Sequence, residues 1–289
     1  MTADLDTLLT ALYVLADEVL PRRPRARRRP KITDAELVCL AVAQILLDIP
    51  SERHFLRFAI TRLGRLFPYL PKQPGYNKRM RTLAPQIVRL LNVVAFSSPS
   101  WYDTVRLLDS TPVPVGASRE TVKRSAFAGH AAYGYCASHS RYFFGFRLYL
   151  LCASDGMPIC FELAPANAPE RDVAAEMLAR VELDGYTVIA DKGFAGADFE
   201  ALMRELRALF LRPDRKDEQP RFGNLGSIRQ TVESIIDTFK GQLSLEQHGA
   251  HTMPGLITRI AQRLLALAAS LWHNWNCGQP GRHLTAYDH

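Results

Sequence analysis

The sequence has few cysteines, and they do not form the patterns that close a disulfide-bonded or zinc-bound fold. Five cysteines are scattered over 289 residues, and none belongs to a Cys-x-x-Cys pair. An odd and scattered set of this kind is typical of free thiols in a reducing compartment. Cys136 and His139 lie three residues apart, but no second pair with zinc-site spacing follows, so we expect no structural zinc ion.

Long apolar segments and a secretory leader are also missing. The apolar stretch at residues 264–271 is far shorter than the roughly 20 residues that a membrane-spanning helix needs. The N-terminus has no basic region ahead of an apolar block, as a signal peptide would. We therefore expect a soluble, cytoplasmic protein with no membrane partner.

What the sequence has in excess is positive charge. Lys and Arg number 36 against 29 Asp and Glu, a formal net charge of +7, which favours an anionic partner such as nucleic acid or a membrane surface. Much of the excess lies in one proline-punctuated stretch. Its basic residues are Arg22, Arg23, Arg25, Arg27, Arg28, Arg29 and Lys31. Such a run is either a solvated linker or an arm that contacts DNA phosphates, and the sequence leaves both interpretations open.

The first hundred residues have the spacing of several short helices. Apolar residues recur at helical intervals over residues 4–20, 51–67 and 77–96. Thr33 is followed three residues later by Glu36, which is the signature of a capping box at the start of another helix. Helices with arginines between them are typical of a DNA-binding module, although a plain bundle that covers a catalytic domain has the same pattern. The charge favours DNA contact.

The pattern changes to alternating strands and helices after residue 103. Apolar and β-branched segments predict strands at residues 105–109, 141–151, 158–163, 186–191 and 208–211. Helical spacing predicts helices at residues 169–181, 197–206, 227–245 and 256–275. We therefore expect an α/β domain with a mixed β-sheet flanked by helices. The domain organisation that follows is a helical, basic N-terminal region over residues 1–100 and a catalytic domain over residues 101–289.

Three acidic residues stand out within the second region. Asp109 and Asp191 are each the last residue of a predicted strand, and the carboxyl ends of adjacent strands open into the same crevice. Glu233 lies on the helix predicted at 227–245, where it shares a charged stripe with Arg229 and Lys240. Taken alone, that stripe is a solvent face with salt bridges. Together with two upstream aspartates, it suggests a joint site.

Carboxylates that converge on one point repel each other unless a cation lies between them. Magnesium binds one or two carboxylates together with water and substrate phosphate oxygens. Two such ions about 4 Å apart activate an attacking hydroxyl and stabilise the leaving oxygen, which suits phosphodiester chemistry. Basic side chains beside such a site are suited to DNA phosphates.

Three motifs occur in a fixed order in this region. They are LDST at 108–111, ADKGF at 190–194, and Arg229, Glu233 and Lys240 in the spacing Arg-x3-Glu-x6-Lys. Together they resemble the DDE transposases of bacterial insertion sequences, which have a ribonuclease-H-like catalytic domain. The resemblance implies that Asp109, Asp191 and Glu233 form a catalytic triad that binds two Mg²⁺ or Mn²⁺ ions. It also implies that Arg229 and Lys240 are the basic pair beside this triad.

The resemblance also implies partners and a reaction. The expected partners are double-stranded DNA, as transposon terminal inverted repeats and as target, and further copies of the chain assembled on that DNA at the bacterial nucleoid. The expected reaction is cleavage at transposon ends followed by strand transfer. One departure is Gly226, which stands where several such families have a tyrosine, so the role of that tyrosine cannot be carried over.

Other functions are open at this stage. A ribonuclease-H-like nuclease that hydrolyses DNA without joining it would use the same carboxylates. A non-enzymatic DNA-binding protein derived from a transposase would keep the fold, although an intact triad speaks against it. An acid–base hydrolase with paired carboxylates is a more remote alternative.

Overall fold

The computed structural model describes residues 3–21, 30–116, 119–136, 140–215, 218–219 and 225–288. The predicted arginine arm at residues 22–29 lies outside these ranges. Contacts divide the chain into two compact units, one of Met1–Ser98 with Phe239–His289 and the other of Pro99–Thr238. The sequence-based division at residue 100 assigned the whole C-terminal part to the catalytic domain, whereas residues 239–289 pack with the N-terminal helices.

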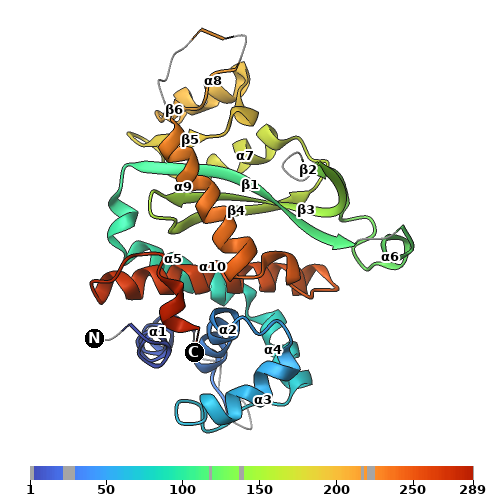
Figure 1. The fold of residues 1–289 in the computed structure, drawn as a ribbon, viewed down its shortest axis with the longest axis vertical. Coiled ribbons are helices and arrows are strands. Elements are labelled where there is room, and N and C mark those ends of the chain that lie inside the picture. The colour runs from blue at the N-terminus through green and yellow to red at the C-terminus, as the bar shows by residue number, and fades with distance from the viewer. Residues whose placement is uncertain are drawn as a thin grey trace. The chain divides into compact units, whose positions relative to one another are not determined.

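The first unit is helical. Its longer helices are α1 (Leu5–Val19), α2 (Asp34–Leu46), α3 (Glu52–Arg62), α4 (Gln73–Thr82), α5 (Ala84–Phe96) and α10 (Met253–Asn276) (Figure 1). Helix α10 contacts α5, α2, α1 and α4, and its residues from Ile260 to Leu271 are all buried. This packing is the reason that a segment so late in the sequence belongs to the N-terminal unit.

Local sequence explains where these helices begin and end. The capping box predicted at α2 is confirmed, because the Thr33 hydroxyl accepts the Glu36 N–H at 3.1 Å and the Glu36 carboxylate accepts the Thr33 N–H. The single helix predicted at 77–96 was wrong. It is two helices that meet at Leu83, because Pro85 cannot supply the N–H that a continuous helix needs.

In the part of the second unit that the structure describes, six strands form one sheet. They are β1 (Val105–Gly116), β2 (Ala132–Cys136), β3 (Arg141–Ala153), β4 (Pro158–Pro165), β5 (Thr187–Ala190) and β6 (Leu209–Leu211). The order is β2-β3-β1-β5-β6, with β4 also paired to β3. Pairs β1–β3, β2–β3 and β3–β4 are antiparallel, whereas β1–β5 and β5–β6 are parallel. The sheet is therefore mixed, which confirms the predicted fold class.

Among the described residues of this unit, four α-helices accompany the sheet: α6 (Arg119–Arg124), α7 (Glu170–Leu178), α8 (Ala197–Glu205) and α9 (Gly226–Asp237) (Figure 1). Helices α7 and α8 cover one face, where Leu108, Tyr149 and Val188 from the strands pack against Met177 and Met203. Helix α9 contacts β1. The sequence did not predict β2 and α6, which are short and lie between undescribed residues.

Strand β1 is longer than predicted. It was expected to end at Asp109, but it continues to Gly116 along β3 through Pro112 and Pro114. Of the residues in β1, only Val105–Leu108 pair with β5, so neither proline interrupts the ladder between these two strands. Gly145 of β3 faces this part of β1 closely, and a Cβ there would lie 2.3 Å from the Val113 carbonyl oxygen.

Across the described ranges, none of the helices combines the length and apolar composition needed to cross a bilayer.

Candidate active site

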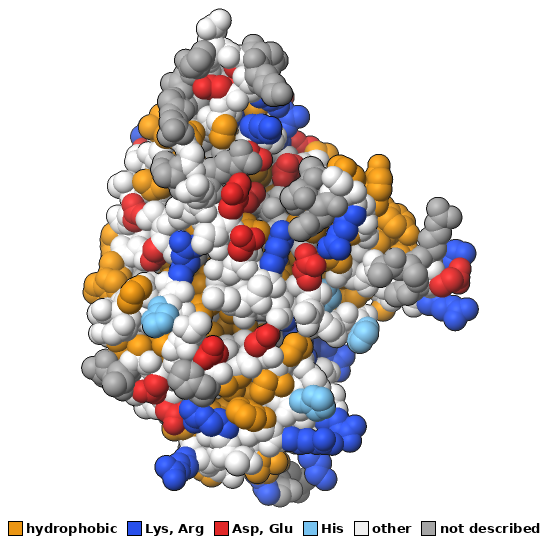
Figure 2. All heavy atoms as spheres, in the orientation of Figure 1, with side chains coloured by type: hydrophobic (Ala, Val, Ile, Leu, Met, Phe, Trp, Pro, Cys, Tyr) orange, Lys and Arg blue, Asp and Glu red, His pale blue; other side chains and the backbone are white. Residues whose placement is uncertain are grey.

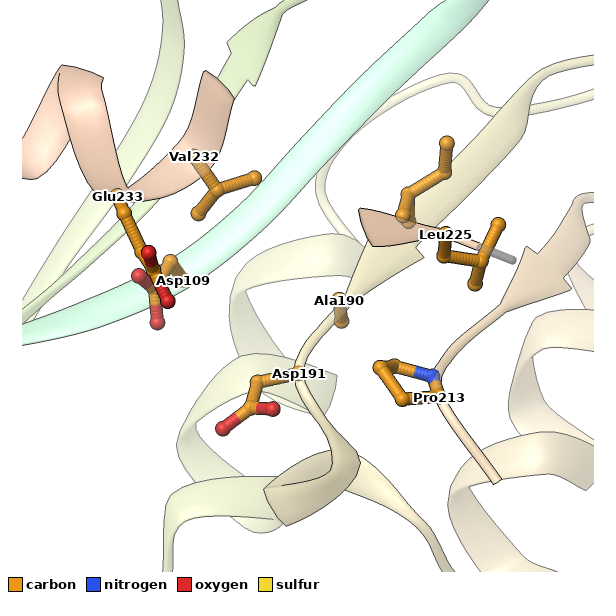
Figure 3. A pocket seen from close by; sticks show the side chains of 8 residues that line it. Asp109, Ala190, Asp191, Pro213, Leu225, Val232 and Glu233 are labelled. Atoms are coloured by element: carbon orange, nitrogen blue, oxygen red, sulfur yellow. The ribbon is translucent and has the colours of Figure 1, made fainter. Parts of the chain in front are cut away.

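A small cavity of about 80 Å³ lies in the second unit (Figure 3). Its walls come from β1, from β5 and the turn that follows it, from the segment after β6, and from α9. The lining residues are Asp109, Ile189, Ala190, Asp191, Pro213, Leu225, Val232 and Glu233. All three acids singled out from the sequence therefore line one cavity. That they act as catalysts stays a prediction.

The parallel pairing of β1 and β5 brings the two aspartates to the same level of the sheet. Leu108 is the last residue of β1 that pairs with β5, and its partner is Ala190, the last residue of that strand. Asp109 and Asp191 come directly after this pair. The sequence had predicted that Asp109 ends its own strand. In the structure it is instead the end of the β1–β5 ladder that places Asp109, because β1 itself continues.

Glu233 reaches the cavity from the helical side. Helix α9 buries Ile235 and Ile236, while Glu233 is exposed and follows Val232, which also lines the cavity. Figure 3 shows Glu233 coming from α9, Asp109 from the strand below it, and Asp191 from the turn after β5. The amphipathic pattern of this helix, readable from the sequence, is what turns the glutamate outward.

Each aspartate is held by the backbone of the residue that follows it. The Ser110 N–H donates to Asp109 Oδ1 at 2.7 Å, and the Lys192 N–H donates to Asp191 Oδ1 at 2.7 Å. Asp109 is half-buried and Asp191 is exposed. These hydrogen bonds fix the orientation of both side chains, whose carboxylate oxygens are ligands suited to a hard cation.

A polar cluster that sequence analysis did not find lies beside Asp109. The Ser110 hydroxyl donates to Glu170 Oε1 at 2.5 Å, and Arg147 Nη1 lies 3.2 Å from Ser110 Oγ and 3.5 Å from Glu170 Oε1. In the sequence, Glu170 is marked only as the second residue of the helix predicted at residues 169–181. Tyr149, the register partner of Ser110, is fully buried, and burial together with the Glu170 charge raises the pKa of its phenol to about 12.

The donor set fits a hard divalent cation by its chemistry, since three carboxylates line the cavity. Within the described part of the chain, no three His, Cys, Asp or Glu side chains are grouped closely enough to hold an ion between them. Magnesium commonly uses only one or two protein carboxylates and completes its shell with water and substrate phosphate. The arrangement is therefore compatible with an ion that the substrate helps to bind.

Unlike the three acids, no predicted basic residue is among the described side chains that line the cavity. Arg229 belongs to α9, but its side chain is not among those described. Lys240 is half-buried in the π-helical segment Thr238–Gln242 and belongs to the other compact unit. Gly226 is the first residue of α9. Lys31, which follows the undescribed arginines, lies over the Tyr69 ring at 5.2 Å from its centroid.

Comparison with known proteins identifies the family. Carboxylates that share a cavity are suited to bind divalent metal ions. The transposase DDE domain matches residues 101–269, more than half of the chain, and the protein belongs to this family. No curated protein matches the sequence significantly.

Among solved structures, the chain is similar to one described as a cryo-EM structure of a piggyBac transposase synaptic complex with hairpin DNA. The TM-score is 0.49 and the sequence identity is 10%. The similarity covers 97% of this chain and 77% of that one.

Proposed function

We propose that this transposase cuts DNA at transposon ends and joins the freed 3′ hydroxyl to target DNA, using Asp109, Asp191 and Glu233. The observation that carries the proposal is the cavity onto which all three acids open. They come from a strand, a turn and a helix that are distant in sequence and that the fold brings together. The family gives the broader statement, that the chain is a transposase.

In this proposal the three carboxylates hold Mg²⁺ or Mn²⁺, with two ions present when DNA is bound. Such ions activate the attacking hydroxyl and stabilise the leaving oxygen of the phosphodiester. The chain's own part is to hold the carboxylates. The N–H groups of Ser110 and Lys192 limit the rotation of Asp109 and Asp191, so that less freedom is lost when a cation binds.

The exposure of the acids suits a large substrate. Asp191 and Glu233 are exposed and Asp109 is half-buried, so the phosphodiester backbone of DNA can approach them from solvent. We assign phosphate contacts to Arg229 and Lys240, and further contacts with the DNA backbone to the arginines of residues 22–29. Each such contact releases counterions, so binding should weaken as salt concentration rises.

The proposed partners are double-stranded DNA, as terminal inverted repeats and target, and a second copy of the chain on paired ends. The net charge of +7 supports a polyanionic partner. On the face shown in Figure 2, Lys and Arg are interspersed with Asp and Glu among the coloured side chains. The described part of this face therefore does not show a field of one sign, and the proposal rests on the site rather than on a basic patch.

A nuclease that cuts without joining is the second candidate, because the same carboxylates would hydrolyse a phosphodiester with water as nucleophile. The products separate the two. Supplied with a pre-cut 3′ end and a second duplex, a transposase gives joined molecules, whereas a hydrolase gives only shorter fragments.

The test is cleavage of a labelled duplex that carries the element's own end, with Mn²⁺ present or removed by chelation. Wild type should cut in a metal-dependent manner, and Glu233→Gln should not, although its glutamine preserves the shape of the side chain. Glu205→Gln is the matched control, since Glu205 is an exposed glutamate at the end of α8, away from the cavity lining. Tight DNA binding without cutting by any of the three proteins would replace the proposal with a non-enzymatic DNA-binding role.

A further inference from the structure

The first turn of α7 touches the segment that follows each of the two aspartates. On the side of Asp109, Glu170 Oε1 accepts the hydroxyl proton of Ser110 at 2.5 Å. Arg147 Nη1 lies 3.2 Å from the same hydroxyl oxygen, so this hydroxyl both donates and accepts. Arg147 also pairs with Glu170 at 3.5 Å, with about a fifth of the arginine and a third of the glutamate side chain exposed.

On the side of Asp191, the same helix turn contacts the turn Lys192–Phe194 and the residue after it. A Cβ on Gly193 would lie 3.1 Å from Glu170 Oε2, so the Glu170 carboxylate comes close to this turn and would have to shift slightly to make room for a side chain. The next residue of the helix, Arg171, donates from Nη1 to the Ala195 carbonyl oxygen at 3.0 Å. Gly193 does not have a positive φ, so its backbone conformation does not require a glycine.

Glu170 does not line the cavity, and the geometry of a strand shows how it reaches the site. Consecutive residues of a strand point to opposite faces, so Ser110 faces α7 while Asp109 faces away from it. The link between the two faces is the backbone of Ser110, whose N–H holds Asp109 Oδ1 at 2.7 Å. Glu170 thus holds Ser110 in place, and Ser110 in turn orients the Asp109 carboxylate.

We propose that Glu170 is a positioning residue for the metal-binding carboxylates, acting on Asp109 through Ser110 and on the turn after Asp191 through its close approach to Gly193. This inference rests on the proposed function. The competing explanation is that Glu170 only stabilises the N-terminus of α7, where an acid interacts favourably with the helix dipole. That explanation gives Ser110 no role, so the two accounts differ in what Ser110→Ala should do.

The experiment is a double-mutant cycle on the full chain with Ser110→Ala, Glu170→Ala and the combined variant. Mn²⁺ binding is measured by calorimetry, and single-turnover cleavage of the end duplex is measured alongside it. Loss of a residue that orients a metal ligand typically costs about tenfold or more in metal affinity or activity. We expect each single variant to lose about tenfold in both Mn²⁺ affinity and cleavage rate. The double variant should lose no more than either single variant, because all three lack the same Glu170–Ser110 hydrogen bond.

Two further variants separate positioning from general damage. Glu170→Gln keeps an oxygen that accepts the Ser110 hydroxyl, so it should bind Mn²⁺ much more tightly than Glu170→Ala. Glu176→Ala removes an exposed acid from the same helix and should match wild type in both readouts. If Glu170→Ala does not fold, Ser110→Ala carries the test alone.

The outcomes distinguish this inference from the proposed function. Wild type that binds no Mn²⁺ and cuts no DNA contradicts the proposed function itself. If wild type binds Mn²⁺ and cuts DNA, and Ser110→Ala equals it in both readouts, the role of Glu170 is overturned and the proposed function is left intact. Fully additive losses in the double variant overturn it as well, because they mean that the two residues act independently.

Discussion

Leu108 of β1 and Ala190 of β5 lie opposite each other in the parallel strand pair, and an aspartate follows each of them. This one pairing fixes the level at which Asp109 and Asp191 stand in the sheet. Helix α9, which contacts β1, adds Glu233 to the same cavity. A ladder register and a helix packing contact are therefore enough to gather three acids that are far apart in the sequence.

The reach of the Glu233 side chain is the first prediction. Glu233→Asp keeps the charge and the exposed position on α9 but withdraws the carboxylate by one methylene. A misplacement on the order of 1 Å at a reacting centre can cost roughly 100-fold in rate, so we expect cleavage to fall by about that factor. Single-turnover kinetics measure this, with Glu205→Asp as the control. A rate close to wild type would mean that the position of this carboxylate does not matter.

Arg212 is predicted to stabilise the segment that follows β6 and includes Pro213 of the cavity lining. Its side chain is 2% exposed and contacts Glu200 at 2.8 Å and Glu218 at 2.6 Å. The hydrogen bond with Glu218, followed by that with Glu200, raises the pKa of the Arg212 guanidinium. Arg212→Met leaves two carboxylates without their shared cation.

Because the two glutamates keep about a quarter of their surface in water, the cost of Arg212→Met should be near the low end for a buried ion pair, about 3 kcal/mol. Urea unfolding measures the loss of free energy of unfolding. The exposed Arg204 of α8 provides the control, as Arg204→Met should cost well under 1 kcal/mol. Equal stability of the two variants would contradict the assigned role.

His273 gives the helical unit a predicted pH dependence. Its ring is 1% exposed, and Nδ1 lies 2.9 Å from the Tyr287 hydroxyl, which donates to Asn274 Oδ1 at 2.5 Å. Burial lowers the pKa of His273 in the folded protein. Unfolding therefore lets the imidazole take up a proton more readily, and the stability it contributes is fully present above about pH 6.5 and is lost as the pH falls through the folded-state pKa.

The measurement is urea unfolding of wild type and His273→Gln between about pH 7.5 and pH 5. Wild type should lose more free energy of unfolding over this interval than the variant, which has no imidazole at this position. The comparison cancels the contribution of the other histidines. A parallel decline in both proteins would show that His273 does not titrate in this range.

Gly145 is predicted to tolerate no side chain. An added Cβ would lie 2.3 Å from the Val113 carbonyl oxygen and 3.0 Å from Pro114 Cα, both of which are backbone atoms of β1. Gly145→Ala should therefore lower the free energy of unfolding by about 2 kcal/mol or more. The contrasting variant is Gly75→Ala in α4, where a Cβ meets nothing within 4 Å and a change of at most about 1 kcal/mol toward stability is expected. Thermal melting of both variants measures these changes. A Gly145→Ala variant that melts at the wild-type temperature would contradict the prediction.

Much of the secondary structure could be predicted from the sequence because its causes are local. The capping box of Thr33 and Glu36 lies within one helix turn, and the apolar stripe of α9 needs only its own residues. The acids that line the cavity were found in the same way, as strand-end and helix-face residues in a recognisable order. The hairpin of β3 and β4 also has a local cause, because a short turn that includes Gly156 at φ 99° joins the two strands.

What the sequence could not give depends on contacts between distant residues. Ser110 and Glu170 are sixty positions apart, and nothing in either segment marks them as partners. The extension of β1 past Asp109 depends on pairing with β3, whose register no local pattern encodes. The placement of residues 239–289 with the N-terminal helices depends on the packing of α10 against α5 and α2.

The central claim is that Asp109, Asp191 and Glu233 bind metal as one site, and Mn²⁺ binding to the full chain tests it most directly. Calorimetry would compare wild type with Asp109→Asn, Asp191→Asn and Glu233→Gln in the presence of a pre-cut end duplex, with Glu205→Gln as the control. The account predicts that each of the three variants loses most of the Mn²⁺ binding while the control keeps it. Undiminished binding in any one of the three would contradict a shared site.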